Sequence, residues 1–160
     1  MMDDTIAFRV QGVPKPGGSK TVFWNHKTNK PRCVDACKKN REWRACVMAF
    51  ARQAYSGPPL EGAIYLDVTF YMPRPRGHYG TGRNAGKLKP SAARYPTVKP
   101  DRTKLLRSTE DALTDCGMWR DDAQVISGPV KKFYEGTNGA VLEDGPGAYI
   151  KIQPLEMGDV

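Results

Sequence analysis

Alternating apolar and polar residues predict several strands along the chain. The clearest alternation spans residues 63–72, where Ile64, Leu66, Val68, Phe70 and Met72 would share one face of a strand. Shorter alternating stretches predict strands at 5–11, 125–126, 130–134 and 148–155, and a hairpin that pairs 21–24 with 31–34 around the polar turn 25–30. The predicted strands lie in both halves of the chain and are separated by segments with a different period.

Two of those segments repeat apolar residues with the period of a helix. In 36–55, one face would carry Trp43, Cys46, Val47, Phe50 and Ala54. In 102–116, the buried face would consist of Leu105, Leu106, Thr109, Ala112, Leu113 and Cys116, and Gly117 would end the helix. The order of strands and helices predicts an α+β fold, a single domain over residues 1–160 with a mixed β-sheet packed with two main helices.

Composition adds a preference for one class of partner. The 160 residues include 25 Lys and Arg against 17 Asp and Glu, a formal net charge of +8, which makes a polyanion the first partner to consider. No apolar run approaches the ~20 residues of a membrane-spanning helix. The N-terminal Met-Met-Asp-Asp lacks the basic and apolar regions of a secretory signal. We therefore expect a cytoplasmic protein with no membrane partner.

A long basic loop is predicted at residues 73–100. It contains no acidic residue, and its cations are Arg74, Arg76, Arg83, Lys87, Lys89, Arg94 and Lys99. This composition suits contacts to the phosphates of a nucleic acid, which hold it without reading its sequence. The alternative is a solvated excursion of the chain without a partner.

Acidic residues gather around the predicted second helix. Asp101 precedes the helix, Glu110, Asp111 and Asp115 lie within it, and the pair Asp121-Asp122 follows it. In a basic protein, such a group favours a hard divalent cation, which binds oxygen ligands and bridges to a substrate phosphate. Each acid also has a structural interpretation: Asp101 as a helix N-cap, Asp121-Asp122 as a solvated turn, and the others as a solvated helix face.

The same region resembles a known family. The residues that carry the resemblance are Pro100-Asp101, the Leu-Leu-Arg step after it, Asp111-Ala112-Leu113, and W-x-D-D-A-Q-V at 119–125, with support from G-V-P-K-P-G-G at 12–18. They are similar to the RusA family of Holliday junction resolvases, in the versions found in phages and prophages. The likeness extends over roughly residues 8–132, and 100–125 is its specific part.

The resemblance implies a homodimeric endonuclease that depends on Mg²⁺, with Mn²⁺ as an alternative, and cuts four-way DNA junctions in the cytoplasm of a bacterial or phage-infected cell. The family's first metal-binding aspartate falls on Asp101 and its last on Asp122, with Asp121 beside it. Its lysine falls on Arg107, which keeps the charge but is a poor general base. Lys104 is a second cation for the substrate phosphate.

One position departs from the family pattern. The family has Asp-x-Asp where this chain reads Asp101-Arg102-Thr103, and a threonine hydroxyl is a poor substitute for a charged ligand. Glu110 shares a helical face with Thr103 and Arg107, so its carboxylate is a candidate to compensate. Two alternatives remain: a branched-DNA-binding protein of the same family with weak or lost cleavage, and a nucleic-acid-binding regulator with no nuclease ancestry.

Overall fold

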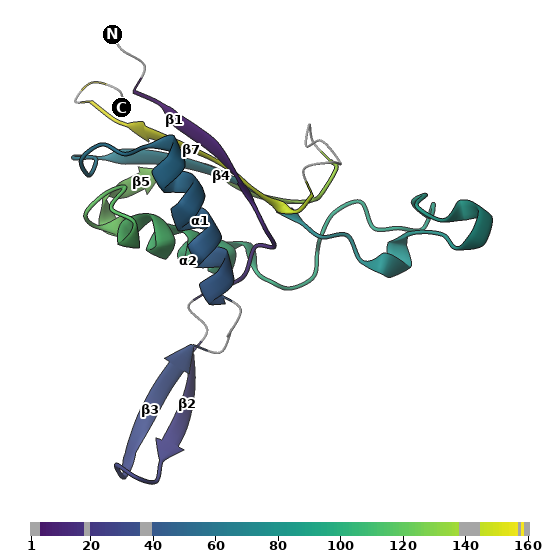
Figure 1. The fold of residues 1–160 in the computed structure, drawn as a ribbon, viewed down its shortest axis with the longest axis horizontal. Helices are drawn as coiled ribbons and strands as arrows, with labels where there is room; N and C mark the ends of the chain where they lie inside the picture. Colours follow the sequence, from purple (N-terminus) through teal and green to yellow (C-terminus); the bar gives the residue numbers. More distant parts are fainter. Residues whose placement is uncertain (1–3, 18–19, 36–39, 138–144, 157, 159–160) are drawn as a thin grey trace.

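A mixed sheet of five strands forms the centre of the fold (Figure 1). The computed structural model describes residues 4–17, 20–35, 40–137, 145–156 and 158. In spatial order the strands are β1 (Ile6–Gln11), β7 (Gly147–Pro154), β4 (Ile64–Met72) and β5 (Val125–Ser127), and β6 (Val130–Tyr134) also pairs with β4. Strand β7 is antiparallel to β1 and β4, whereas β5 and β6 are parallel to β4. The predicted mixed sheet is confirmed.

Two helices, α1 (Asn40–Ala54) and α2 (Arg102–Asp115), pack against each other, and α1 also packs on β1. The predicted start of the first helix at 36–39 lies outside the described residues. Trp43 and Val47 are buried as expected, but Ala54 is exposed and Ala51 is buried in its place. Ala54 is the last residue of α1, so no further helical turn covers it. With both helices present, the α+β fold class is confirmed.

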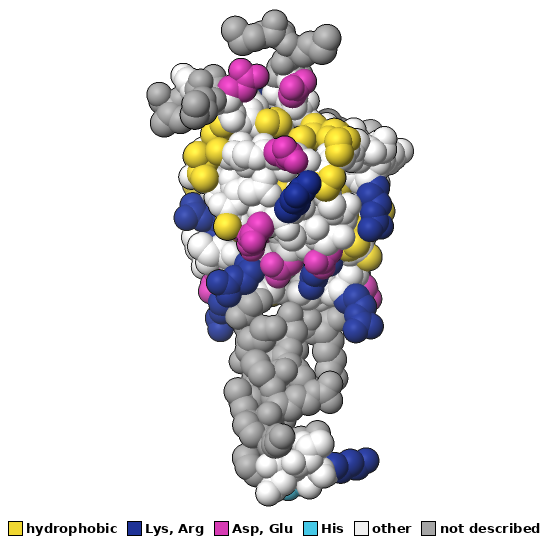
Figure 2. All heavy atoms as spheres, turned by 90° about the vertical axis from the view of Figure 1, so that its left-hand side faces the viewer, with side chains coloured by type: hydrophobic (Ala, Val, Ile, Leu, Met, Phe, Trp, Pro, Cys, Tyr) yellow, Lys and Arg dark blue, Asp and Glu magenta, His cyan; other side chains and the backbone are white. Residues whose placement is uncertain are grey.

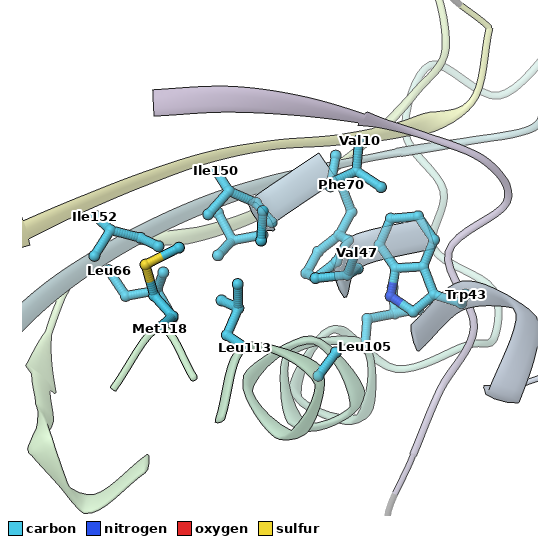
Figure 3. Close-up of a cluster of buried hydrophobic side chains, with 14 of the residues drawn as sticks. Val10, Trp43, Val47, Leu66, Phe70, Leu105, Leu113, Met118, Ile150 and Ile152 are labelled. Carbon is cyan, nitrogen blue, oxygen red and sulfur yellow. The ribbon is translucent and has the colours of Figure 1, made fainter. Parts of the chain in front are cut away.

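The core lies between these helices and the sheet (Figure 3). Trp43 from α1 meets Phe70 from β4 with ring centroids 6.4 Å apart. Its indole Nε1 donates a hydrogen bond of 3.1 Å to Oγ1 of Thr109, so the buried polar atom has a partner. Ser108 is also fully buried, which the apolar pattern of the sequence did not predict. It donates 2.5 Å to the carbonyl of Lys15, and this bond attaches the segment after β1 to α2.

The C-terminus of α2 ends as the sequence predicts. Gly117 adopts a φ of 82°, in the region that favours glycine. Its N–H donates to Thr114 O and the N–H of Met118 donates to Leu113 O, both at 3.0 Å, which is a Schellman motif. The motif reverses the chain directly after α2 and sends residues 118–125 back along the helix.

Two segments extend from this body in different directions (Figure 1). The predicted hairpin is confirmed as β2 (Lys20–Asn25) and β3 (Lys30–Asp35), which form a separate antiparallel sheet. The predicted loop at 73–100 contains two 3-10 turns, η1 (Arg76–His78) and η2 (Gly82–Asn84). Backbone hydrogen bonds from Gly80 to Lys87 and from Lys89 to His78 close its tip, so this part of the loop has local order. Among the described residues, no helix has the length and apolar character needed to cross a membrane.

Candidate active site and nucleic-acid interface

The acidic residues around α2 fall into two groups, and Asp101 forms the first. Asp101 occupies the N-cap position of α2, but its side chain makes no capping hydrogen bond. Its Oδ2 lies 3.5 Å from Nζ of Lys104, and both side chains are about half exposed. The hydrogen bond by which the side chain of Asp101 would cap and stabilise the helix is therefore absent.

Lys132 is a second cation beside Asp101, which the sequence analysis missed. It lies on β6, and its Nζ donates to the carbonyls of Val98 and Pro100, both at 2.9 Å. Burial lowers the pKa of Lys132 from its usual 10.5, and the charge of Asp101 opposes this shift. The sequence offered one signal for Lys132, the adjacent pair Lys131-Lys132 within a predicted strand. Because successive side chains of a strand point to opposite faces of the sheet, the two lysines cannot both lie on the same face.

The second group consists of Glu110, Asp111 and Asp122. Burial and the charges of Asp122 and Asp111 together raise the pKa of Glu110 to about 7, against the opposing charge of Arg107. Burial likewise raises the pKa of Asp111; Arg44 opposes this shift and Asp122 adds to it. None of the three acids forms an ion pair with a described residue. Glu110 and Asp111 are partly buried beside the exposed Asp122, and such mutually repelling carboxylates are unfavourable for folding, so the group is a candidate for function.

Asp122 is positioned by the short turn η3 (Asp122–Gln124), and Gln124 holds that turn. Oε1 of Gln124 accepts from the backbone N–H groups of Arg120 and Asp121, at 3.0 and 3.1 Å. Its Nε2 donates to the carbonyls of Leu60 and Gly62, both at 3.0 Å. The side-chain amide of Gln124 therefore joins the turn to the segment that precedes β4.

The two aspartates of the turn have different roles. Oδ1 of Asp121 accepts 2.8 Å from the N–H of Ala123 and completes a capping box with Gln124. Asp122 is exposed and has no hydrogen bond to a described residue. The interpretation of the pair as a turn is thus correct for Asp121, while the carboxylate of Asp122 stays available to a ligand.

The donor set fits a hard divalent cation only in part. Glu110, Asp111 and Asp122 offer carboxylate oxygens, which Mg²⁺ and Mn²⁺ accept, and a cation would relieve their repulsion. Among the described residues, however, no three acid, His or Cys side chains already converge as a metal site. Asp101 lies nine residues before Glu110, about 13 Å along the helix axis. The structure thus groups Asp122 with Glu110 and Asp111, and leaves Asp101 at the other end of α2.

Other charged groups surround these acids. Asp115 forms an ion pair with Arg44, which joins α2 to α1 and agrees with its expected place on a solvated face. Arg107, Thr103 and Lys104 are exposed along α2. Asp111, Asp115, Asp121 and Asp122 line a shallow hollow with Arg44 and Arg120. On the face turned toward the viewer in Figure 2, acidic side chains lie among Lys and Arg side chains, an arrangement suited to an anionic substrate and its counter-ions.

The basic loop contains cations of two kinds. Arg74 is used within the chain: its Nη1 donates 2.7 Å to Ala93 O, and its guanidinium carbon lies 4.3 Å from the ring centroid of Tyr134. Arg94 lies over the ring of Tyr95 at 5.5 Å and remains exposed. The other cations of the loop are exposed, namely Arg76, Arg83, Lys87, Lys89 and Lys99. The loop therefore presents positive charge to solvent, and Arg74 maintains its base.

Comparison with known protein families identifies a related family. The sequence model of a protein family described as endodeoxyribonuclease RusA matches residues 15–143. No curated protein matches the chain at a significant level. The matched segment includes α2, η3 and every acid described above.

Proposed function

Because this match covers well over half of the chain, the chain belongs to the RusA family of endodeoxyribonucleases, and we propose that it resolves four-way DNA junctions by paired phosphodiester cuts. The proposed enzyme depends on Mg²⁺ or Mn²⁺ and acts as a homodimer, since two symmetric cuts need two sites and a twofold axis supplies them. The observation that carries the proposal is the group Glu110, Asp111 and Asp122, three neighbouring carboxylates that form no close ion pair with a described residue, inside the segment that matches the family.

Each part of the site has a proposed task. Asp122 is the principal ligand, Glu110 and Asp111 supplement it, and Asp121 shapes the turn. Asp101 supplies the acid at the other end of α2, between Lys104 and Lys132. A divalent cation bound by Asp122 and these supplementary acids would polarise the phosphodiester and lower the pKa of an attacking water. Arg107 binds the scissile phosphate and offsets the charge that develops on it. The exposed cations of the loop 73–100 bind the phosphates of the junction arms.

Thr103 supports a second candidate function, a junction-binding relative that no longer cuts. Thr103 is exposed on the first turn of α2, two residues after Asp101, where the family pattern has a second aspartate. If Glu110 and Asp111 do not compensate, metal affinity falls and cleavage is lost while binding persists. Thr103→Asp separates the two functions: a large gain of cleavage from near zero indicates a lost activity, and little change indicates a rearranged metal site.

Cleavage of a labelled mobile four-way junction tests the proposal. The wild-type protein with Mg²⁺ should give symmetric nicks that disappear with EDTA and with Asp122→Asn. Asp115→Asn is the matched control, because Asp115 is a nearby acid that already pairs with Arg44. It should keep cleavage near the wild-type level. Tight junction binding without nicks would favour the non-cutting relative, and equal loss in both variants would contradict the proposed site.

A further inference from the structure

A pocket of about 540 Å³ lies beside Asp101, apart from the group around Asp122. One wall comes from the segment after β1, another comes from the end of the basic loop, and Met72 and Tyr134 also line the pocket. Six of the lining residues are prolines: Pro14, Pro16, Pro73, Pro75, Pro96 and Pro100. We call this site the proline pocket. Its volume lies in the range of pockets that bind small molecules, ~300–1,000 Å³.

Hydrogen bonds hold both walls of the proline pocket in place. On one side, Gly17 N donates 2.9 Å to Lys104 O and Ser108 donates to Lys15 O, so this wall is attached to α2. A Cβ on Gly17 would lie only 3.0 Å from the side chain of Ser108. Because glycine has no Cβ, this wall can approach α2 closely at Gly17. On the other side, Lys132 donates to the carbonyls of Val98 and Pro100. Proline rings fix the backbone further, so the pocket is formed before a ligand arrives.

The charged groups of the proline pocket lie around an apolar interior. Lys15, Lys99 and Lys104 are its cations, and Asp101 is its one acid. Lys99 and Lys104 are exposed, and Lys15 is half-buried. This arrangement suits a ligand with a flat, weakly polar body joined to anionic groups. A nucleobase with its flanking phosphates has this chemistry, and the carboxylate of Asp101 can accept a hydrogen bond from an exocyclic amino group.

We propose that the proline pocket binds one unpaired nucleobase of the branched DNA, while Lys15, Lys99 and Lys104 bind the phosphates beside it. The inference rests on the proposed binding of branched DNA and adds a site that selects it. A base in regular duplex must be unstacked and unpaired before it can enter, at a cost of a few kcal/mol, and this cost is lowest for a base that is already unpaired. The pocket therefore favours a junction over plain duplex if a base at the crossover opens at a lower cost than a base within a duplex arm, and it does so without reading a long sequence.

The test uses the full chain in EDTA, so that it does not depend on cleavage. The probe is a four-way junction with 2-aminopurine placed in turn at each nucleotide near the crossover, because this base analogue fluoresces more strongly when it leaves the stack. Wild-type protein should raise the fluorescence at one crossover position and leave a 2-aminopurine in the duplex arms unchanged. The absence of any rise at the crossover would overturn the inference.

Two variants place a charge inside the proline pocket, one on each wall. Val13 and Val98 are 38% and 62% exposed, so Val13→Asp and Val98→Asp should fold. Leu88→Asp is the control, since Leu88 is 52% exposed in the same loop, lies outside the pocket and gives the same change of charge. Both pocket variants should lose the fluorescence rise and bind the junction about tenfold more weakly than Leu88→Asp, because a base that enters the pocket would cover the added carboxylate and remove it from water.

The possible results separate this inference from the proposed function. Equal behaviour of Val98→Asp and Leu88→Asp would overturn the proline pocket as a base site, whatever the protein cuts. A fluorescence rise that both pocket variants lose, together with no cleavage of the same junction in Mg²⁺, would support the pocket and contradict the nuclease proposal.

Discussion

The four hydrogen bonds of Gln124 lead to a quantitative prediction for the turn that carries Asp122. Gln124→Met keeps the length of the side chain and removes all four bonds. A hydrogen bond contributes about 0.5–1.5 kcal/mol net, and the released groups lie in accessible loops where water can replace part of the loss. The expected decrease in the free energy of unfolding is therefore about 2 kcal/mol, at the low end of the sum.

Urea unfolding with a shared slope measures this change. Gln153→Met is the matched control: Gln153 lies half-buried on β7 and has no side-chain hydrogen bond to a described residue, so its unfolding free energy should change little. A loss equal to the control would refute the argument that Gln124 anchors the turn. Metal-dependent cleavage should also fall in Gln124→Met and persist in Gln153→Met, because only the first variant releases Asp122 from its position.

Two further predictions concern the interior of α2. Since the pKa of Glu110 is about 7 instead of 4.5, folded Glu110 holds its proton more tightly than the unfolded chain between these pH values, and stability falls as pH rises through them. Glu110→Gln should remove this dependence and raise the free energy of unfolding at pH 8 by about 1–3 kcal/mol, a range that includes a discount for the screening of a half-buried group. At pH 4 the substitution should give no gain. Urea titrations in the presence of EDTA measure both values. Thr109→Val leaves the buried indole N–H of Trp43 without its acceptor and should cost about 1–3 kcal/mol by the same assay; no change would mean that water or another group satisfies the indole.

The sequence predicted the elements whose pattern is local. The alternation in β4 and the helical period of α2 each follow from residues a few positions apart, so strand and helix bounds agree with the structure within one or two residues. The glycine after α2 was also predictable, because a left-handed C-terminal residue has a strong residue preference. The burial of Ser108 was not predictable from the same pattern, since it depends on the approach of Lys15 and Gly17 from a distant part of the chain.

The candidate site was predictable in its residues but only partly in their roles. Acids around one helix are visible in the sequence, whereas their partners are not. Asp115 is paired with Arg44, and Arg74 is committed to contacts within the loop, and both facts depend on tertiary structure. For Asp111 the sequence left open whether it belongs to a cation site or to a solvated helix face. The charge of Asp122, brought back along α2 by the Schellman motif, places Asp111 in an electrostatic group.

In the segment W-x-D-D-A-Q-V, most side chains form contacts within the chain that position the candidate ligand Asp122. Trp119 is buried and donates 2.7 Å to Oγ1 of Thr114, which fixes the start of the segment on α2. Gln124 and the cap of Asp121 fix its other end. What remains is the carboxylate of Asp122, held near Glu110 on a short turn that the capping box stabilises. Because a carboxylate that is to bind a cation must be positioned before the cation arrives, the residues that hold Asp122 in place would also matter at the proposed site. Substitution of Trp119 or Gln124 should therefore reduce cleavage through the position of Asp122, and added Mg²⁺ or Mn²⁺ should restore part of that activity.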